Sequence, residues 1–332
     1  MKKWVEEQIN STTKKAMPIL SFSCAQLLGV KVSELISSAS LQAKGMIEVA
    51  KRVDSLASVS LMDLSVEAEC FGSTISVSED EVPTVVGRIV ESEEDAEKLG
   101  VPKVGSARSG LYVEAIRLAS ESITDRPVFA GMVGPFSLSA RLMDVTEIMM
   151  LCYDEPEMVH TVMGKTTEFL IEYAKAYKNA GANGVVIAEP VSGLLSPSLE
   201  SDFSSPYVKR IVDAVQDDEF IVVYHNCGNN VAKMTESIAS IGAMAYHFGN
   251  SVDMETMLKA FPENVLVMGN VDPAGVLRMG NKKTVRETTL AVMEKCQDYK
   301  NFIISSGCDI PPLTPWENID AFFDTVKEFY EK

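Results

Sequence analysis

The chain has 332 residues, 46% of them hydrophobic and 23% charged, which is typical of a folded globular protein. Its formal net charge of −17 argues against a nucleic-acid-binding protein and against docking on an anionic membrane, because both partners attract a basic surface. No apolar stretch approaches the roughly 20 residues that span a bilayer, and the N-terminus turns polar before any apolar core, so we expect no signal peptide. The six dispersed cysteines are too few for a disulfide framework and are typical of a cytoplasmic protein.

Short apolar runs recur along the chain, each followed by a Gly, Pro or Asn turn and then by a stretch with helical spacing. We predict seven buried strands, at residues 55–61, 128–134, 184–190, 220–226, 243–249, 265–271 and 302–308. An eighth is expected near residues 74–86 or at the N-terminus. Alternating strands and helices imply a parallel sheet, and no G-x-G-x-x-G follows the first strand. The sequence therefore predicts an α/β fold, a single (β/α)8 TIM barrel over residues 1–332 with an N-terminal helical extension.

Two helices are delimited by the residues at their ends. The stretch 155–180 has Pro156 in its first turn and ends at the glycine of "NAGAN". The last helix is predicted over 315–331, because Thr314 and Glu317 have the spacing of a capping box.

The residues that end the predicted strands are the candidates for function, because a TIM barrel carries its active site at the carboxyl ends of its strands. His225 and Cys227 lie where one strand ends, His247 ends the next, and Cys308 ends the last. Glu189 ends an earlier strand. Two of the three histidines and two of the six cysteines thus fall at one rim of the barrel.

One imidazole and two thiolates are the ligands of a tetrahedral zinc site with a fourth position left over, and sulfur favours zinc over magnesium or calcium. We therefore predict a metal site at His225, Cys227 and Cys308. His-x-Cys alone is a weak signal, and the joint placement with Cys308 carries the prediction. Such a site suits the binding of a substrate thiol as thiolate, a nucleophile for methyl transfer, better than the activation of water. The other four cysteines are interpreted as small buried hydrophobes.

Four segments resemble the methylcobamide:thiol methyltransferases, best known as methylcobamide:coenzyme M methyltransferases, of the uroporphyrinogen decarboxylase superfamily. These segments are "GMVGPFSLSARL" (131–142), "VVYHNCGN" (222–229), "MGNVDP" (268–273) and "SSGCDIPPLTPWENIDAF" (305–322). The resemblance implies a TIM barrel with Zn²⁺ at its mouth, held by the residues matching His225, Cys227 and Cys308. It also implies that an acceptor thiol such as coenzyme M takes a methyl group from a methyl–Co(III) corrinoid (a methylcobamide) on a separate small corrinoid-binding protein.

The chain departs from the family pattern after the His-x-Cys loop, where the family has a motif like "SVE" and this chain has "YHFGN" (246–250). The identity of the fourth zinc ligand is therefore undecided. His247 is a candidate catalytic residue, either as a ligand or donor near the metal or in a substrate-contacting or structural role. Glu189 is a second candidate, with a helix-capping acid as the alternative.

Other functions stay open at this stage. A uroporphyrinogen decarboxylase would need arginines near the first strand for a substrate with eight carboxylates, and residues 14–29 contain none. The same site residues would also serve methyl transfer in the reverse direction, or to a folate. A zinc-stabilised barrel that only docks a corrinoid protein is disfavoured, because structural zinc sites are closed by four protein ligands. No Asp-x-His-x-x-Gly occurs, so the corrinoid would come from a separate partner or as free methylcobalamin.

Overall fold

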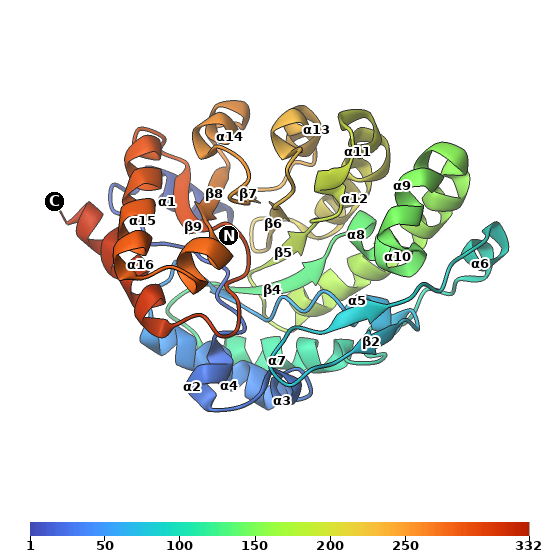
Figure 1. Cartoon of the computed structure of the whole chain (residues 1–332), viewed down its shortest axis with the longest axis horizontal. Coiled ribbons are helices and arrows are strands. Elements are labelled where there is room, and N and C mark those ends of the chain that lie inside the picture. Colours follow the sequence, from blue (N-terminus) through green and yellow to red (C-terminus); the bar gives the residue numbers. More distant parts are fainter. Residues whose placement is uncertain (332) are drawn as a thin grey trace.

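The computed structural model describes residues 1–331, and Lys332, the last residue of the predicted domain, lies outside them. Its central sheet has seven strands in the order β1-β4-β5-β6-β7-β8-β9, and each neighbouring pair is parallel. The strands are β1 Ser58–Val59, β4 Val128–Val133, β5 Gly184–Ala188, β6 Ile221–Asn226, β7 Ala245–Phe248, β8 Leu266–Val271 and β9 Phe302–Ser306. All seven predicted strands are confirmed. The sheet curls, and helices cover its outer side (Figure 1).

The continuous apolar runs of these strands follow from burial on both faces of the sheet. In β6, Ile221 and Val223 belong to an inner cluster of side chains that fills the curl. Val222 and Tyr224 belong to the larger outer cluster, in which the strands pack against the helices. A strand buried on both sides has no polar face, so it lacks the alternation of a half-buried strand.

Residues 16–19 lie between the two edges of the sheet. The backbone N–H of Met17 donates to the carbonyl of Ile304 in β9 at 3.0 Å, and that of Leu56, just before β1, donates to the carbonyl of Ala16 at 2.8 Å. This N-terminal segment thus lies where the eighth strand of a barrel is expected.

Residues 74–86, the other predicted location of the eighth strand, lie outside the central sheet. There β2 (Thr74–Ser76) and β3 (Thr84–Val86) pair antiparallel as a separate two-stranded sheet. The placement of an eighth barrel strand at 74–86 is therefore wrong. Residues 78–81, which are polar or acidic, lie in the loop between the two short strands.

The helices alternate with the strands as predicted from β4 onward, and none of them within residues 1–331 is long and apolar enough to cross a membrane. They are α1 Lys2–Asn10, α2 Cys24–Leu28, α3 Val32–Leu35, α4 Ala39–Arg52, α5 Val66–Cys70, α6 Glu93–Lys98, α7 Ser109–Ser122, α8 Pro135–Met143, α9 Val145–Asp154, α10 Pro156–Asn179, η1 Ser192–Leu194, α11 Pro197–Phe203, α12 Ser205–Val215, η2 Val231–Lys233, α13 Thr235–Ser240, α14 Met254–Ala260, η3 Pro273–Arg278, α15 Lys282–Cys296 and α16 Trp316–Tyr330.

The ends of α10 agree with the prediction, but the N-terminus of α16 does not. Pro315, with φ −59° and ψ 128°, is the N-cap residue, so the helix begins one residue later than expected. The hydroxyl of Thr314 is buried without a hydrogen-bond partner in the described part of the chain. The predicted capping box is therefore wrong, because Thr314 lies one residue too far upstream to reach the first turn.

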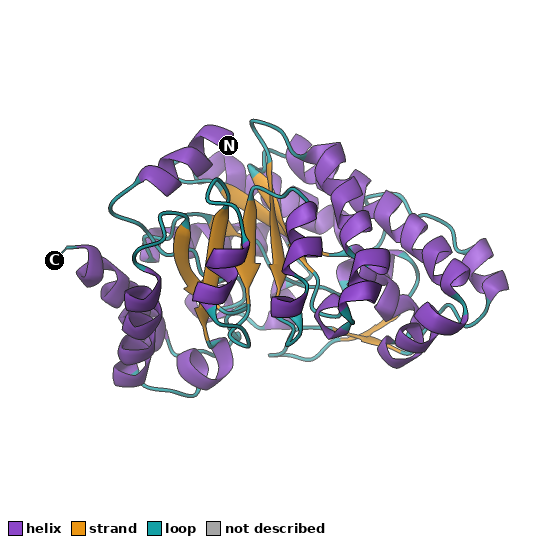
Figure 2. Ribbon diagram, turned by 90° about the horizontal axis from the view of Figure 1, so that it is seen from above, coloured by secondary structure: helices purple, strands orange, loops and turns teal. Residues whose placement is uncertain are grey.

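Helix α1 covers the amino-terminal end of the sheet. The ring of Trp4 meets the ring of Phe129 edge-on at 5.9 Å, and Val5 packs in the inner cluster. The backbone N–H of Lys2 donates to the carbonyl of Asp218, in the loop before β6, at 3.0 Å. The opposite end of the sheet, toward which the strand arrows point, is free of α1 (Figure 2). We call this carboxyl-terminal end the mouth.

Candidate metal centre

The three predicted ligands meet at the mouth, where β6 and β9 end. One ligand atom each from His225, Cys227 and Cys308 lies within 4.8 Å of the others, and Cys308 Sγ is 3.5 Å from His225 Nε2. These separations are close to those between neighbouring ligands around an ion bound at about 2.0–2.3 Å. His225 is buried and both cysteines are half-buried. No fourth His, Cys, Asp or Glu of residues 1–331 belongs to the group, so the donor set fits a zinc ion that keeps one position for another ligand.

The loop after β6 is held by contacts that only small residues allow. A Cβ atom added to Gly249 would lie 2.6 Å from Cα and Cβ of Cys227. The Oδ1 atom of Asn226 accepts from the Gly228 N–H at 2.9 Å, and Ser251 Oγ donates to the Cys227 carbonyl at 3.2 Å. Asn226 at the end of β6, Gly249 after β7 and Ser251 thus hold the backbone and Cβ of Cys227 in place.

A chain of hydrogen bonds determines which nitrogen of His225 faces the cysteines. Ser305 Oγ donates to the Met17 carbonyl at 2.7 Å, so it accepts from His247 Nε2, which is also 2.7 Å away. His247 Nδ1 then carries the lone pair and accepts from His225 Nδ1 at 2.8 Å. The proton positions follow from this bonding pattern. His225 Nε2 is left without a proton, and its lone pair faces Cys308.

His247 lies behind His225 and is not one of the three clustered ligands. It is buried, and burial together with the neighbouring His225 holds the pKa of His247 well below its usual range. The imidazole is therefore neutral, as the hydrogen-bond chain requires. Of the roles considered for His247, this geometry corresponds to a residue that orients the predicted ligand His225.

The carboxylate of Glu189 points at the first turn of α8. Oε1 accepts from the Phe136 N–H at 2.8 Å, and Oε2 accepts from the N–H and the hydroxyl of Ser137 at 2.9 and 2.7 Å. Burial raises the pKa of Glu189 to about 7, against the lowering effect of these hydrogen bonds. Its backbone N–H donates to the His225 carbonyl at 2.9 Å. Glu189 thus caps a helix through its side chain, which was the alternative interpretation, and adjoins the predicted ligand His225 through its backbone.

The two cysteines affect each other's ionisation. A hydrogen bond from Cys308 lowers the pKa of Cys227, despite the burial that opposes it. The thiolate is the form that ligates a metal, so this shift would favour ligation by Cys227.

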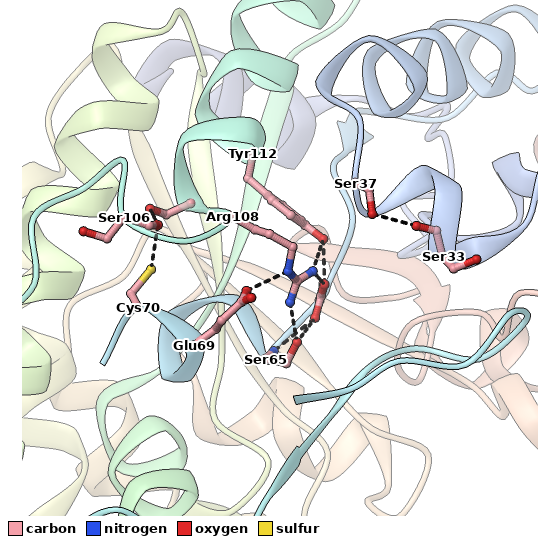
Figure 3. Close-up of polar contacts among 10 residues, drawn as sticks. Ser33, Ser37, Ser65, Glu69, Cys70, Ser106, Arg108 and Tyr112 are labelled. Atoms are coloured by element: carbon pink, nitrogen blue, oxygen red, sulfur yellow. Dashed lines mark hydrogen bonds and ion pairs between the residues drawn. The ribbon is translucent and has the colours of Figure 1, made fainter. Parts of the chain in front are cut away.

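The sequence analysis did not identify a charged cluster at the end of β1. Asp63 has a fully buried side chain and pairs with Arg108, and it accepts from Tyr112 Oη at 2.6 Å. Arg108 also binds Glu69 at 2.7 Å and Ser65 at 2.9 Å (Figure 3). The sequence could have identified Asp63 as a candidate, because it follows the predicted strand 55–61 much as His225 ends its own strand.

The remaining histidine, His160, has a packing role away from this site. The ring of His160 stacks on Phe203 with centroids 4.4 Å apart, and its Nδ1 lies 2.7 Å from Tyr207 Oη.

Comparisons with known proteins identify the family of the chain. The model of the uroporphyrinogen decarboxylase family matches residues 9–329. The methylcobamide:CoM methyltransferase MtbA of Methanosarcina acetivorans is 30% identical over 274 residues, which are 80% of this chain and 78% of that protein. The uroporphyrinogen decarboxylase of Coxiella burnetii is 28% identical over 258 residues, which are 75% of this chain and 70% of that protein.

A solved structure shares the fold. The methyltransferase from Methanosarcina mazei matches with a TM-score of 0.87 at 23% identity, and the match covers 99% of this chain and 98% of that one. The family match extends over nearly the whole chain, and the predicted resemblance to the methylcobamide:thiol methyltransferases is confirmed. The chain therefore belongs to the uroporphyrinogen decarboxylase family, and it is one of the methyltransferases of that family.

Proposed function

We propose that this chain is a zinc-dependent corrinoid methyltransferase. It would move a methyl group from a methyl–Co(III) corrinoid, carried by a separate small protein, to a thiol such as coenzyme M. The observation that supports this most is the convergence of one imidazole nitrogen and two sulfurs within 4.8 Å, in a chain 30% identical to a methylcobamide:CoM methyltransferase.

The residues at the mouth prepare the site for a thiol. His225 Nε2, Cys227 Sγ and Cys308 Sγ would hold the zinc ion, which when bound supplies the positive charge that keeps an acceptor thiol deprotonated. His247 and Ser305 hold His225 in the tautomer that presents a lone pair. Two thiolates balance the charge of a divalent ion, so the acceptor sulfur keeps its electron density for attack on the methyl group.

We propose that residues 1–332 form one domain, a (β/α)8 barrel with residues 16–19 as its eighth strand and α1 as an N-terminal extension. The hydrogen bonds of Met17 to β9 and of Ala16 to Leu56 support the closure. The family match over residues 9–329 supports a single domain.

The rim of the mouth is the face that we propose for the corrinoid protein. We define the rim as the loops that follow β5, β8 and β9. Each carries one large and exposed hydrophobic side chain: Leu194 is 53% exposed, Met279 78% and Leu313 52%. Apolar side chains around a site are typical of a protein-docking surface. The donor cobalt has to reach the acceptor sulfur at the mouth, so a partner on this rim has the right access.

A decarboxylase function has less support, although decarboxylases are among the relatives. Residues 14–29 offer only two cations, and both are engaged. Lys14 donates to the Lys300 carbonyl, and Lys15 pairs with Asp54 at 2.7 Å. A substrate with eight carboxylates would find no cluster of arginines there.

A methyl-transfer assay tests the proposal. The zinc-loaded protein is mixed with methylcobalamin and 2-mercaptoethanesulfonate, and the loss of the methyl–cobalt absorbance is followed together with the thioether product. We expect transfer by the wild type, its loss in Cys308→Ala, and wild-type rates in Cys296→Ala, which removes a buried thiol outside the ligand group. Equal rates in the wild type and Cys308→Ala would contradict the proposal.

A further inference from the structure

The N-terminal segment that lies against β9 contacts residues on both sides of Cys308. The Ile19 N–H donates to Ser306 Oγ at 3.1 Å, and the Ile19 carbonyl accepts from the Ile310 N–H at 2.9 Å. Ser306 comes two residues before Cys308, and Ile310 comes two residues after it. The turn that carries this predicted ligand is therefore joined at both ends to one residue of the N-terminal segment.

Ser21, two residues further along the same segment, holds the side chain of Asp309, which directly follows Cys308. The Ser21 hydroxyl donates to Asp309 Oδ2 at 2.8 Å, and the Ser21 N–H donates to Oδ1 of the same carboxylate at 3.4 Å. Ser21 Oγ also accepts from the Met62 N–H, in the loop after β1, at 3.4 Å. Ser21 is buried, and exclusion of water strengthens the bonds that it makes.

The Asp309 carboxylate has few other ways to be held. Among residues 1–331, Ser21 is its only hydrogen-bond partner, and no cation lies within 4.0 Å of it. A half-buried carboxylate needs hydrogen bonds in place of the water that it loses. The position of the residue next to Cys308 thus depends on a serine 288 positions away in the chain.

The same segment also reaches His225, through a separate set of bonds. The Met17 carbonyl accepts from Ser305 Oγ. Ser305 Oγ accepts from His247, which accepts from His225. Residues 17–21 therefore contact the surroundings of two of the three predicted ligands, and a shift of this segment would disturb both.

We propose that Ser21 is a positioning residue of the metal centre, which acts on Cys308 through Asp309. This inference rests on the proposed function, because it takes Cys308 to hold the zinc ion. Ser21 bonds to the residue after Cys308 and not to the thiol, so it would set the direction of the Cys308 side chain. Linkage adds a second effect. If docking of residues 16–21 on β9 favours zinc binding, bound zinc stabilises that docking by the same factor.

Zinc affinity, measured by competition with a chromogenic chelator, tests the role of the hydroxyl. We expect about a 10-fold loss in Ser21→Ala, at the lower end of the range for residues that support a metal ligand. Ser23→Ala is the matched control, because the Ser23 hydroxyl is fully buried and has no hydrogen-bond partner within residues 1–331. The control should bind zinc as the wild type does. Equal losses in the two variants, or no loss in Ser21→Ala, would overturn the inference and leave the proposed function intact.

A double-mutant cycle tests whether Ser21 acts through Asp309. Asp309→Ala removes the carboxylate, so adding Ser21→Ala to it should cause no further loss of zinc affinity. Losses that add would show that Ser21 acts by another route and would overturn the inference. In the cobalt-substituted protein, the thiolate-to-cobalt absorption bands of both single variants should differ from those of the wild type. Bands identical to wild type in Ser21→Ala would contradict a role in positioning.

Hydrogen exchange measures the linkage without turnover. Peptides that cover residues 16–22 should exchange more slowly in the zinc-loaded wild type than in the zinc-free protein. Ser21→Ala should reduce this difference, and Ser23→Ala should keep it. Equal exchange with and without zinc in the wild type would overturn the inference. A lower unfolding temperature of Ser21→Ala at unchanged zinc affinity would show that Ser21 only closes the barrel, and would also overturn it. A wild type that binds no zinc would overturn the proposed function itself.

Discussion

His247 Nδ1 lies 2.8 Å from His225 Nδ1, and this contact between two buried imidazoles determines which nitrogen of His225 keeps its proton. The bond has one proton, and the Ser305 hydroxyl on the far side of His247 decides which ring donates it. The result is a lone pair on His225 Nε2, directed at Cys308. The N-terminal segment is part of this arrangement, because the Met17 carbonyl receives the Ser305 proton.

The histidine pair gives the first prediction. His247→Phe removes the acceptor for His225 Nδ1 but keeps a ring of similar size, so the tautomer of His225 is no longer fixed. We expect zinc affinity to fall about 10- to 100-fold, as for other residues that orient a metal ligand. Competition with a chromogenic chelator measures it. His160→Phe, which alters a histidine packed on Phe203 away from the site, is the control. Affinity within twofold of wild type in His247→Phe would show that the contact does not orient the ligand.

Gly249 gives the second prediction, which is steric. An added Cβ would lie 2.6 Å from Cys227 Cβ, closer than side-chain carbons approach, so Gly249→Ala should displace the thiol. We expect zinc affinity to fall at least about 10-fold. Gly164→Ala in α10 is the matched control, because a Cβ there meets nothing within 4 Å. That change should raise the free energy of unfolding by about 0.5–1 kcal/mol. Unchanged zinc binding in Gly249→Ala would mean that the loop relaxes without cost to the site.

The third prediction distinguishes binding of the corrinoid protein from the methyl-transfer reaction itself. Leu313→Asp places a charge on the exposed apolar rim, so KM for a methylated corrinoid protein should rise about 10-fold or more. Transfer from free methylcobalamin should not change, because the variant leaves the metal ligands alone. Met150→Asp on α9, which alters a hydrophobic side chain of similar exposure (49%) away from the rim, should affect neither rate. An equal loss with both donors would argue against the rim as the docking face.

Glu67 gives a prediction about pH. It is buried at the start of α5, Oε1 accepts from the Val133 N–H at 2.9 Å, and burial raises its pKa from 4.5 to about 7. The folded state therefore binds this proton more tightly than the unfolded chain does. The stability that the proton contributes is complete below pH 4.5 and is lost as the pH rises through 7.

Glu67→Gln keeps the shape of the protonated acid and removes its titration. The free energy of unfolding of the variant, relative to wild type, should therefore increase between pH 5 and pH 8, by up to about 3 kcal/mol. Urea unfolding across this range measures it, and comparison with the wild type cancels the other buried acids. A difference that stays constant with pH would show that Glu67 does not titrate in this range.

The strands and the clustering of the three predicted ligands were predictable because both follow from local patterns. Continuous apolar runs reflect burial on two faces, and His225, Cys227 and Cys308 mark the ends of such runs. The closing segment 16–19 was harder to predict, since Pro18 lacks an N–H and the segment bonds partly through side chains such as that of Ser306. The segment lies between both edges of the sheet, so its role as a closing strand depends on contacts that form only when both edges are present.

The roles of Glu189 and His247 depend on contacts between distant parts of the chain. Glu189 meets α8 across 52 residues, and the Ser305 that orients His247 is 58 residues away.

Metal analysis tests the central claim most directly. Zinc is measured by elemental analysis in the purified wild type, in His225→Ala and Cys308→Ala, and in Cys296→Ala as the control for loss of a thiol. We predict about one zinc ion per chain in the wild type and in Cys296→Ala, and little or none in the two ligand variants. A wild type without zinc, or zinc retained by both ligand variants, would contradict the metal centre and the methyl transfer proposed from it.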